Sequence, residues 1–169
     1  MFSKQTRTET VTLGALLNEN RTEEMVWNSP RLFVSDWLVF QIKTNASHVR
    51  TLEIRQTPLK PGEKLFVVGW TNSQKEGPQR TYEYEYYKTV GTHILLKDLV
   101  VPANPGGLSG APVVDENGSL LGIVSDWTVD PDTGKRFFLP CVVTGLAAFL
   151  DNILAEKTPS DVGKLFSDA

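Results

Sequence analysis

The hydrophobic and polar positions of this chain alternate mainly with the period of β-strands. Residues 81–90, T-Y-E-Y-E-Y-Y-K-T-V, alternate aromatic and charged side chains, which is typical of a strand with one buried and one wet face. Residues 64–70, K-L-F-V-V-G-W, read as a buried strand that ends at a glycine. Further strands are predicted at residues 8–17, 94–101 and 135–143, with two more apolar runs on either side of the turn at 115–118. Residues 32–43 form a strongly apolar segment with one acidic residue inside it.

One segment near the end of the chain has a helical period instead. Its apolar residues follow the spacing i, i+3, i+4, i+7, i+8, at Leu146, Phe149, Leu150, Ile153 and Leu154. Thr144 precedes them as a predicted N-cap, and Pro159 ends the pattern. The sequence therefore predicts a C-terminal helix, followed by a loosely held tail at residues 158–169.

A turn rich in glycine and proline, P-A-N-P-G-G-L-S-G-A-P at residues 102–112, carries the chemistry that stands out most. Ser109 lies in it between Gly107 and Gly110. Glycines allow unusual backbone angles, so such a turn can expose a serine hydroxyl and direct N–H groups toward one point. A nucleophile with an oxyanion hole needs this arrangement. A loop with an incidental serine would show the same local pattern, so both interpretations remain open on these residues alone.

The wider stretch resembles the trypsin-like serine peptidases in two motifs at the family's spacing. G-L-S-G-A-P-V at residues 107–113 is similar to the nucleophile motif, and G-I-V-S-D-W at 122–127 is similar to the segment that follows it. The resemblance implies that Ser109 is the nucleophile and that the N–H groups of Gly107 and Ser109 form the oxyanion hole. Leu108 stands where the digestive members of the family carry an aspartate, which pairs with the N-terminus that is freed when the zymogen is activated. This difference argues against activation of that kind and not against catalysis.

Asp36 lies inside the apolar segment 32–43, where burying a carboxylate is costly unless something donates hydrogen bonds to it. It can be a strand-edge or turn aspartate, or the carboxylate that orients a catalytic histidine. D-W-L-V-F-Q-I at residues 36–42 resembles the family strand that this aspartate opens. Asp36 precedes Ser109 by 73 residues, which resembles the compact bacterial HtrA-like branch. The resemblance also assigns Ala103, Ser125 and Trp127 to the substrate pocket.

The general base is missing from its expected place. A serine hydroxyl needs a histidine to take its proton, and in the family that histidine precedes the aspartate. The two histidines, His48 and His93, both follow Asp36, and we expect neither to be catalytic. We expect instead that the chain is a fragment whose histidine lies upstream. The alternatives are a pseudopeptidase, and a different hydrolase that uses Ser109 with His93.

The resemblance implies an all-β fold of two six-stranded antiparallel barrels, the first incomplete, with a C-terminal helix. We place the first barrel at residues 1–58, the second with the helix at 59–157, and the tail at 158–169. The expected function is a serine endopeptidase that lacks its base in this chain. The alternative function is a non-catalytic module that binds peptides or proteins in the same cleft.

Composition and charge limit the kinds of partner, cofactor and membrane segment that the chain can be expected to have. A net charge of −3 without a basic stripe gives no support to a nucleic-acid partner. The single cysteine excludes internal disulfides, and no apolar run is long enough to span a bilayer. Asp130 and Asp132 faintly resemble a calcium loop, but turn chemistry explains them better, so no metal or cofactor is expected. The expected partner is a peptide or protein substrate, with compartment and oligomeric state left open.

Overall fold

The computed structural model describes residues 11–18, 36–47, 49–130 and 132–156. The elements in chain order are β1 (Val11–Leu16), β2 (Phe40–Asn45), β3 (Lys64–Gly69), β4 (Arg80–Val90), β5 (His93–Val100), β6 (Pro112–Val114), β7 (Leu120–Val129), β8 (Arg136–Val142) and α1 (Thr144–Glu156). They fall into two compact units. One holds β1, β2 and residues 148–156, and the other holds residues 36–37 and 52–147. The predicted boundary between residues 58 and 59 stays a prediction.

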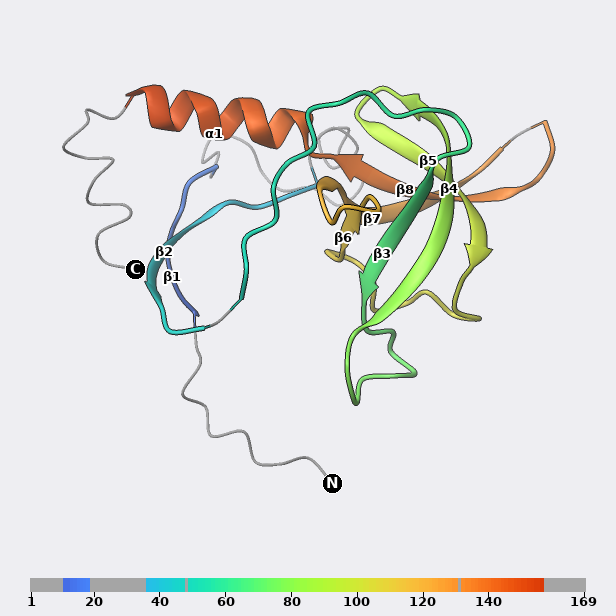
Figure 1. The fold of residues 1–169 in the computed structure, drawn as a ribbon, viewed down its shortest axis with the longest axis horizontal. Helices are drawn as coiled ribbons and strands as arrows, with labels where there is room; N and C mark the ends of the chain where they lie inside the picture. The colour runs from blue at the N-terminus through green and yellow to red at the C-terminus, as the bar shows by residue number, and fades with distance from the viewer. Residues whose placement is uncertain (1–10, 19–35, 48, 131, 157–169) are drawn as a thin grey trace, which may run out of the picture. The chain divides into compact units, whose positions relative to one another are not determined.

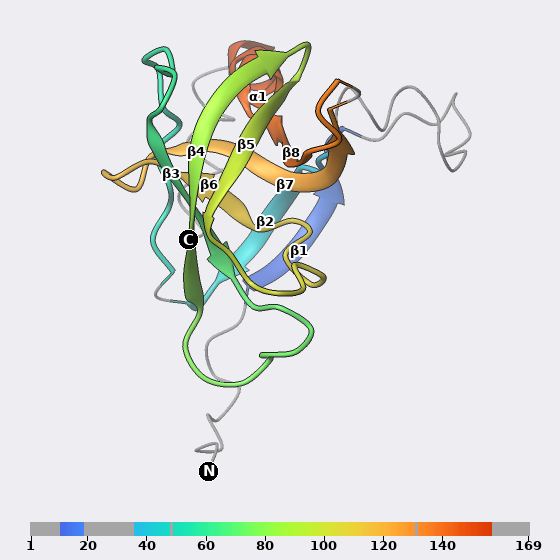
Figure 2. The ribbon, with the colours of Figure 1, turned by 90° about the vertical axis from the view of Figure 1, so that its right-hand side faces the viewer.

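Strands β3 to β8 close into a six-stranded antiparallel barrel with the order β3-β4-β5-β8-β7-β6 (Figures 1 and 2). The short strand β6 completes the ring, because it pairs with β7 on one side and with β3 on the other. Closure leaves no unpaired strand edge. The predicted all-β fold with a C-terminal helix is confirmed. Two barrels were predicted, the first incomplete, and the described residues contain one closed six-stranded barrel and a separate two-stranded sheet.

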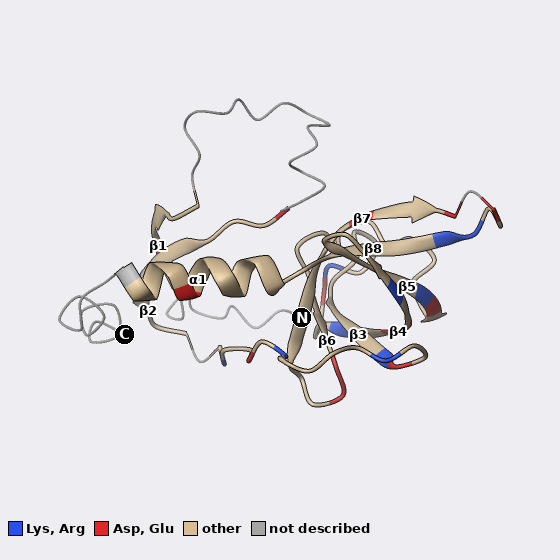
Figure 3. Cartoon of the chain, turned by 90° about the horizontal axis from the view of Figure 1, so that it is seen from above, with Lys and Arg blue, Asp and Glu red and all other residues tan. Residues whose placement is uncertain are grey.

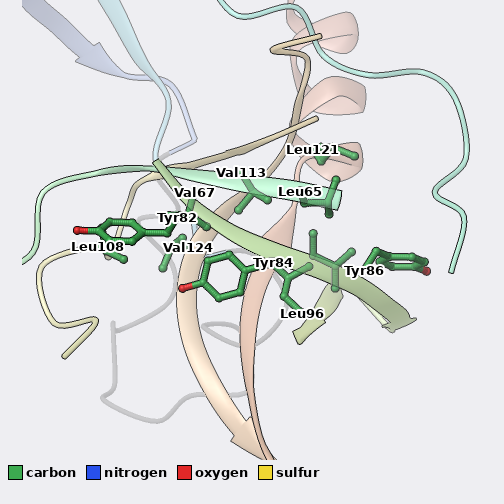
Figure 4. Close-up of a cluster of buried hydrophobic side chains, with 11 residues drawn as sticks. Leu65, Val67, Tyr82, Tyr84, Tyr86, Leu96, Leu108, Val113, Leu121 and Val124 are labelled. Carbon is green, nitrogen blue, oxygen red and sulfur yellow. The ribbon is translucent and has the colours of Figure 1, made fainter. Parts of the chain in front are cut away.

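The barrel interior is filled by the alternate residues that the sequence pattern assigns to it. On β4, Tyr82, Tyr84 and Tyr86 are buried, and Leu65 and Val67 of β3 are fully buried beside them. The cluster is drawn in Figure 4 and also includes Ile94, Leu96, Leu108, Val113, Leu121 and Val124. Among these, Leu108 comes from the loop before β6 rather than from a strand. The nucleophile-like turn is therefore anchored in the core.

Arg55 fixes the segment before β3 to the barrel. Its guanidinium forms a two-pronged ion pair with Glu63, and Nη1 also lies 3.3 Å from Oδ2 of the buried Asp115. The same segment forms two main-chain hydrogen bonds with Leu120 of β7, donating one and accepting the other. A planar guanidinium with several oriented acceptors gives a more specific contact than a single surface ion pair.

The other unit contains the two-stranded antiparallel sheet of β1 and β2. Its apolar residues Val11, Leu13, Phe40 and Ile42 are exposed in the structure. The strand that the resemblance places at residues 36–42 begins later in the structure, since β2 begins only at Phe40. Asp36 thus precedes the strand instead of opening it.

Charged residues of both signs are interspersed over the strands and hairpins of the barrel (Figure 3). Lys64 pairs with Glu83, and Lys97 pairs with Glu85, across neighbouring strands. These pairs are exposed, so each contributes at most about 1 kcal/mol to stability. The described helix is not long and apolar enough to cross a membrane.

Candidate active site

The loop between β5 and β6 presents Ser109 and buries its neighbour. Ser109 is exposed, whereas Leu108 is fully buried in the barrel core. Gly107 and Gly110 on either side have φ values of 101° and 82°, in the region that favours glycine. The glycines therefore allow backbone angles at which the Leu108 side chain is buried while the next residue, Ser109, is exposed.

Four backbone N–H groups around Ser109 have acceptors. Gly106 donates to Oδ1 of Asn104, Leu108 to Pro105, Gly110 to Val124 and Ala111 to Leu108, over 2.8 to 3.1 Å. Within the described residues, the interleaved N–H groups of Gly107 and Ser109 have no acceptor, and both residues are exposed. These are the two N–H groups that the resemblance predicts to form an oxyanion hole.

A short chain of contacts connects this loop to Asp36. The N–H of Gly110 donates to the Val124 carbonyl on β7, 2.8 Å away. The next residue on β7, Ser125, donates its hydroxyl to Oδ2 of Asp36 over 2.6 Å. The structure thus brings Asp36 and Ser125 into direct contact, one residue along β7 from the attachment of the Ser109 loop. Asp36 is exposed, which corrects the expectation of a buried carboxylate.

The sequence profile described as Trypsin matches residues 18–153, which include the loop, Asp36 and the barrel. The chain belongs to the trypsin family. Kallikrein-related peptidase 10, solved in complex with Zn2+, is similar with a TM-score of 0.54 and 13% identity, over 71% of this chain and 65% of that chain. Neuropsin, a serine protease from mouse brain, is similar with a TM-score of 0.60 and 13% identity, over 85% of this chain and 71% of that chain.

At 13% identity these two structures establish the fold alone. The chain spans about two thirds of the length of kallikrein-related peptidase 10. A comparison with curated proteins found no match. The prediction of a trypsin-like fold is confirmed, whereas the similarity to HtrA-like peptidases stays a prediction.

In this trypsin-family chain, His93 does not partner Ser109. His93 opens β5 opposite Cys141 of β8, is buried, and has its Nδ1 3.4 Å from the Thr92 hydroxyl. Burial lowers the pKa of His93, although the carboxylates of Asp36 and Asp126 act in the opposite direction. Within the described residues no hydrogen bond joins His93 to Ser109 or to Asp36. His48 lies outside the described residues.

Cys141 lies close to Asp36. It is almost fully buried, and burial raises the pKa of its thiol. A hydrogen bond with the Asp36 backbone acts in the opposite direction. The described residues contain no cluster of three His, Cys, Asp or Glu side chains that could hold a metal ion.

The three residues predicted for the substrate pocket have different contacts in the structure. Ala103 lines a cavity of about 290 Å³, which also contains the charged residues Asp98 and Arg136. Burial raises the pKa of Asp98, and the nearby Arg136 opposes this shift. Ser125 contacts Asp36 instead, and the half-exposed Trp127 has the Arg136 guanidinium 4.0 Å from its ring centroid. The aromatic rings of Tyr84 and Phe138 form another part of the cavity wall.

Sequence reasoning missed Asn72, which follows β3 and lies against the loop between β5 and β6 that carries Ser109 (the nucleophile-like loop). Its N–H donates to the carbonyl of Gly106 over 2.7 Å. A main-chain contact between segments 34 residues apart leaves no mark in residue type, because any residue except proline can donate it. The clustered glycines at 106 and 107 were the available signal, since glycine often marks a close approach of another backbone.

Proposed function

We propose that this chain is part of a serine endopeptidase in which Ser109 attacks the peptide carbonyl and forms an acyl-enzyme. The N–H groups of Gly107 and Ser109 hold the oxyanion, and Asp36 orients the histidine that accepts the serine proton. The observation that carries the proposal is that the N–H groups of Gly107 and Ser109, which the reaction requires, are exposed and have no acceptor within the described residues.

The general base is a histidine other than His93, because His93 is buried on β5 and forms no hydrogen bond with Ser109 within the described residues. Without its base, a serine enzyme keeps only the rate enhancement that the oxyanion hole and binding supply. We therefore expect this chain by itself to hydrolyse peptides very slowly. The substrates are peptides or proteins, bound with one side chain in the cavity beside Ala103.

A non-catalytic peptide-binding module is the second candidate. The observation that favours it is the Ser109 hydroxyl, which has no hydrogen-bond partner within the described residues. A pseudopeptidase would keep the same fold and cleft while lacking a base.

Labelling with a fluorophosphonate probe distinguishes these candidates. The comparison uses this chain, its Ser109→Ala variant, and a version extended by upstream coding sequence wherever that sequence encodes a histidine. Ser47→Ala, in the other unit, is the matched serine control. We expect labelling of the extended form that Ser109→Ala abolishes and Ser47→Ala leaves intact. A folded extended form that is not labelled would contradict the peptidase and favour the binding module.

A further inference from the structure

The residues that follow β3 hold the peptide unit between Gly106 and Gly107 through a hydrogen bond to its carbonyl group. The N–H of Asn72 donates to the Gly106 carbonyl over 2.7 Å, one of the shortest main-chain hydrogen bonds outside the regular elements that the structure describes. The peptide bond is trans, since the described chain contains no cis peptide. In a trans peptide the C=O and N–H groups point in opposite directions. The N–H of Gly107 is therefore directed away from Asn72.

Side-chain space at Gly107 is closed by the same segment. A Cβ atom added there would lie 2.7 Å from the backbone nitrogen of Asn72 and 3.0 Å from the carbonyl carbon of Thr71. Real Cβ atoms do not approach backbone atoms so closely, so the loop and the Asn72 segment fit each other only with glycine at this position. Gly110 has a similarly positive φ, but a Cβ atom there would meet nothing within 4 Å.

The segment that holds the peptide is itself fixed. Thr71 is fully buried, its hydroxyl lies 3.1 Å from that of Ser73, and its carbonyl accepts from the N–H of Gln74. Just before it, the Cβ position of Gly69 lies 3.1 Å from a methyl group of Leu108. The end of β3 and the nucleophile-like loop thus contact each other at two places, one apolar and one through the main chain.

We infer that the Asn72 backbone is a positioning group that keeps the Gly107 N–H available to the oxyanion, an inference that rests on the proposed function. If the bond from Asn72 to Gly106 were lost, rotation of this peptide would turn the Gly106 carbonyl oxygen toward the oxyanion. A carbonyl oxygen there repels negative charge, whereas an N–H stabilises it. The same scaffold would then keep Ser109 and lose one of its two donors.

The direction of the Gly107 N–H can be measured without any ligand or activity. One-bond N–H residual dipolar couplings of the folded chain report each N–H vector relative to the barrel. We expect the Gly107 coupling of the unmodified chain and of Asn72→Ala to fit the same orientation, because alanine keeps the donor. Asn72→Pro removes the donor, and its coupling at position 107 should no longer fit.

If Asn72→Pro does not fold, the matched pair Gly107→Ala and Gly110→Ala tests whether the Asn72 backbone fixes the orientation of the N–H at position 107. Both place alanine at a positive φ in the same loop, but only Gly107→Ala introduces an atom against Asn72. We expect the orientation at position 107 to change in Gly107→Ala and to be kept in Gly110→Ala. An unchanged orientation in folded Asn72→Pro, or in Gly107→Ala, would overturn the inference.

Phenylboronic acid supplies the functional readout in the extended form that carries the upstream histidine, because its adduct with an activated serine places an oxygen in the oxyanion hole. We expect downfield shifts of the amide protons at positions 107 and 109 in the extended form and in its Asn72→Ala and Gly110→Ala variants. The shift at position 107 should be lost in Gly107→Ala. If the folded extended form shows no response, the proposed function is contradicted, while the dipolar couplings still decide the role of Asn72.

Discussion

Leu108 offers the sharpest test of how the nucleophile-like loop is held in place. The side chain is fully buried in the barrel core, next to the exposed Ser109. One of its methyl groups lies 3.1 Å from the Cβ position of Gly69, so backbone forms part of its surroundings. Backbone in a closed barrel cannot move into a vacated space as a side chain can. A truncation here should therefore leave a cavity that the structure fills poorly.

Leu108→Ala should reduce the free energy of unfolding by about 3 to 4 kcal/mol. Leucine-to-alanine substitutions in rigid cores cost roughly 2.7 to 5.0 kcal/mol, and the cost rises with the volume of the cavity that remains. With a urea slope of about 1.5 kcal/mol per M, the unfolding midpoint should fall by about 2 M. Urea denaturation followed by tryptophan fluorescence measures this shift.

Leu99→Ala on β5 is the matched control, because Leu99 is 46% exposed in the same barrel. It should lower the midpoint by less than about 0.5 M, since truncations of exposed side chains usually cost little. A Leu108→Ala shift as small as that of Leu99→Ala would refute the idea that apolar burial anchors the loop. An anchor of another kind, such as a charged contact, would then have to be found.

Two further predictions concern acid stability and substrate choice. The hydrogen bond from Arg55 lowers the pKa of Glu63 below its ordinary value of 4.5. Stability from this ion pair is complete above pH 4.5 and is lost as the pH falls through the lowered value. Glu63→Gln should therefore flatten the fall of unfolding free energy below pH 4.5, whereas Glu116→Gln at an exposed site should not; equal slopes would contradict this. Because Ala103 offers no charge, peptides that differ only before the cleaved bond should be cleaved fastest with small or medium apolar residues there, and a clear preference for Arg or Lys would contradict this.

Much of the barrel could be predicted because one face of each strand is buried. The alternation at Tyr82, Tyr84 and Tyr86 marks the inward positions of β4 directly. The start of the strand expected at residues 36–42 was wrong, because an apolar run shows that burial is favourable without showing where strand pairing begins. Strand β2 starts only at Phe40, and Asp36 lies ahead of it.

The candidate site could be predicted only in part. The glycines around Ser109 reveal a tight turn, because glycine adopts positive φ angles without steric cost. The contact between Asp36 and Ser125 joins residues 89 positions apart and was not predicted, because the resemblance assigns Ser125 to the substrate pocket. The bond from Asn72 could not be predicted, because it uses main-chain atoms that every residue carries.

Cys141 gives this fold a built-in reporter of its own opening. It is the single cysteine of the chain, and in the barrel it is almost fully buried on β8 opposite His93. Because Cys141 is buried, a thiol reagent must wait until the structure around β8 opens. In the closed barrel the raised pKa also keeps the thiol protonated and therefore unreactive. The rate at which the thiol is modified in water therefore measures how often the barrel opens around Cys141. Every variant discussed above can be compared on that scale without denaturant.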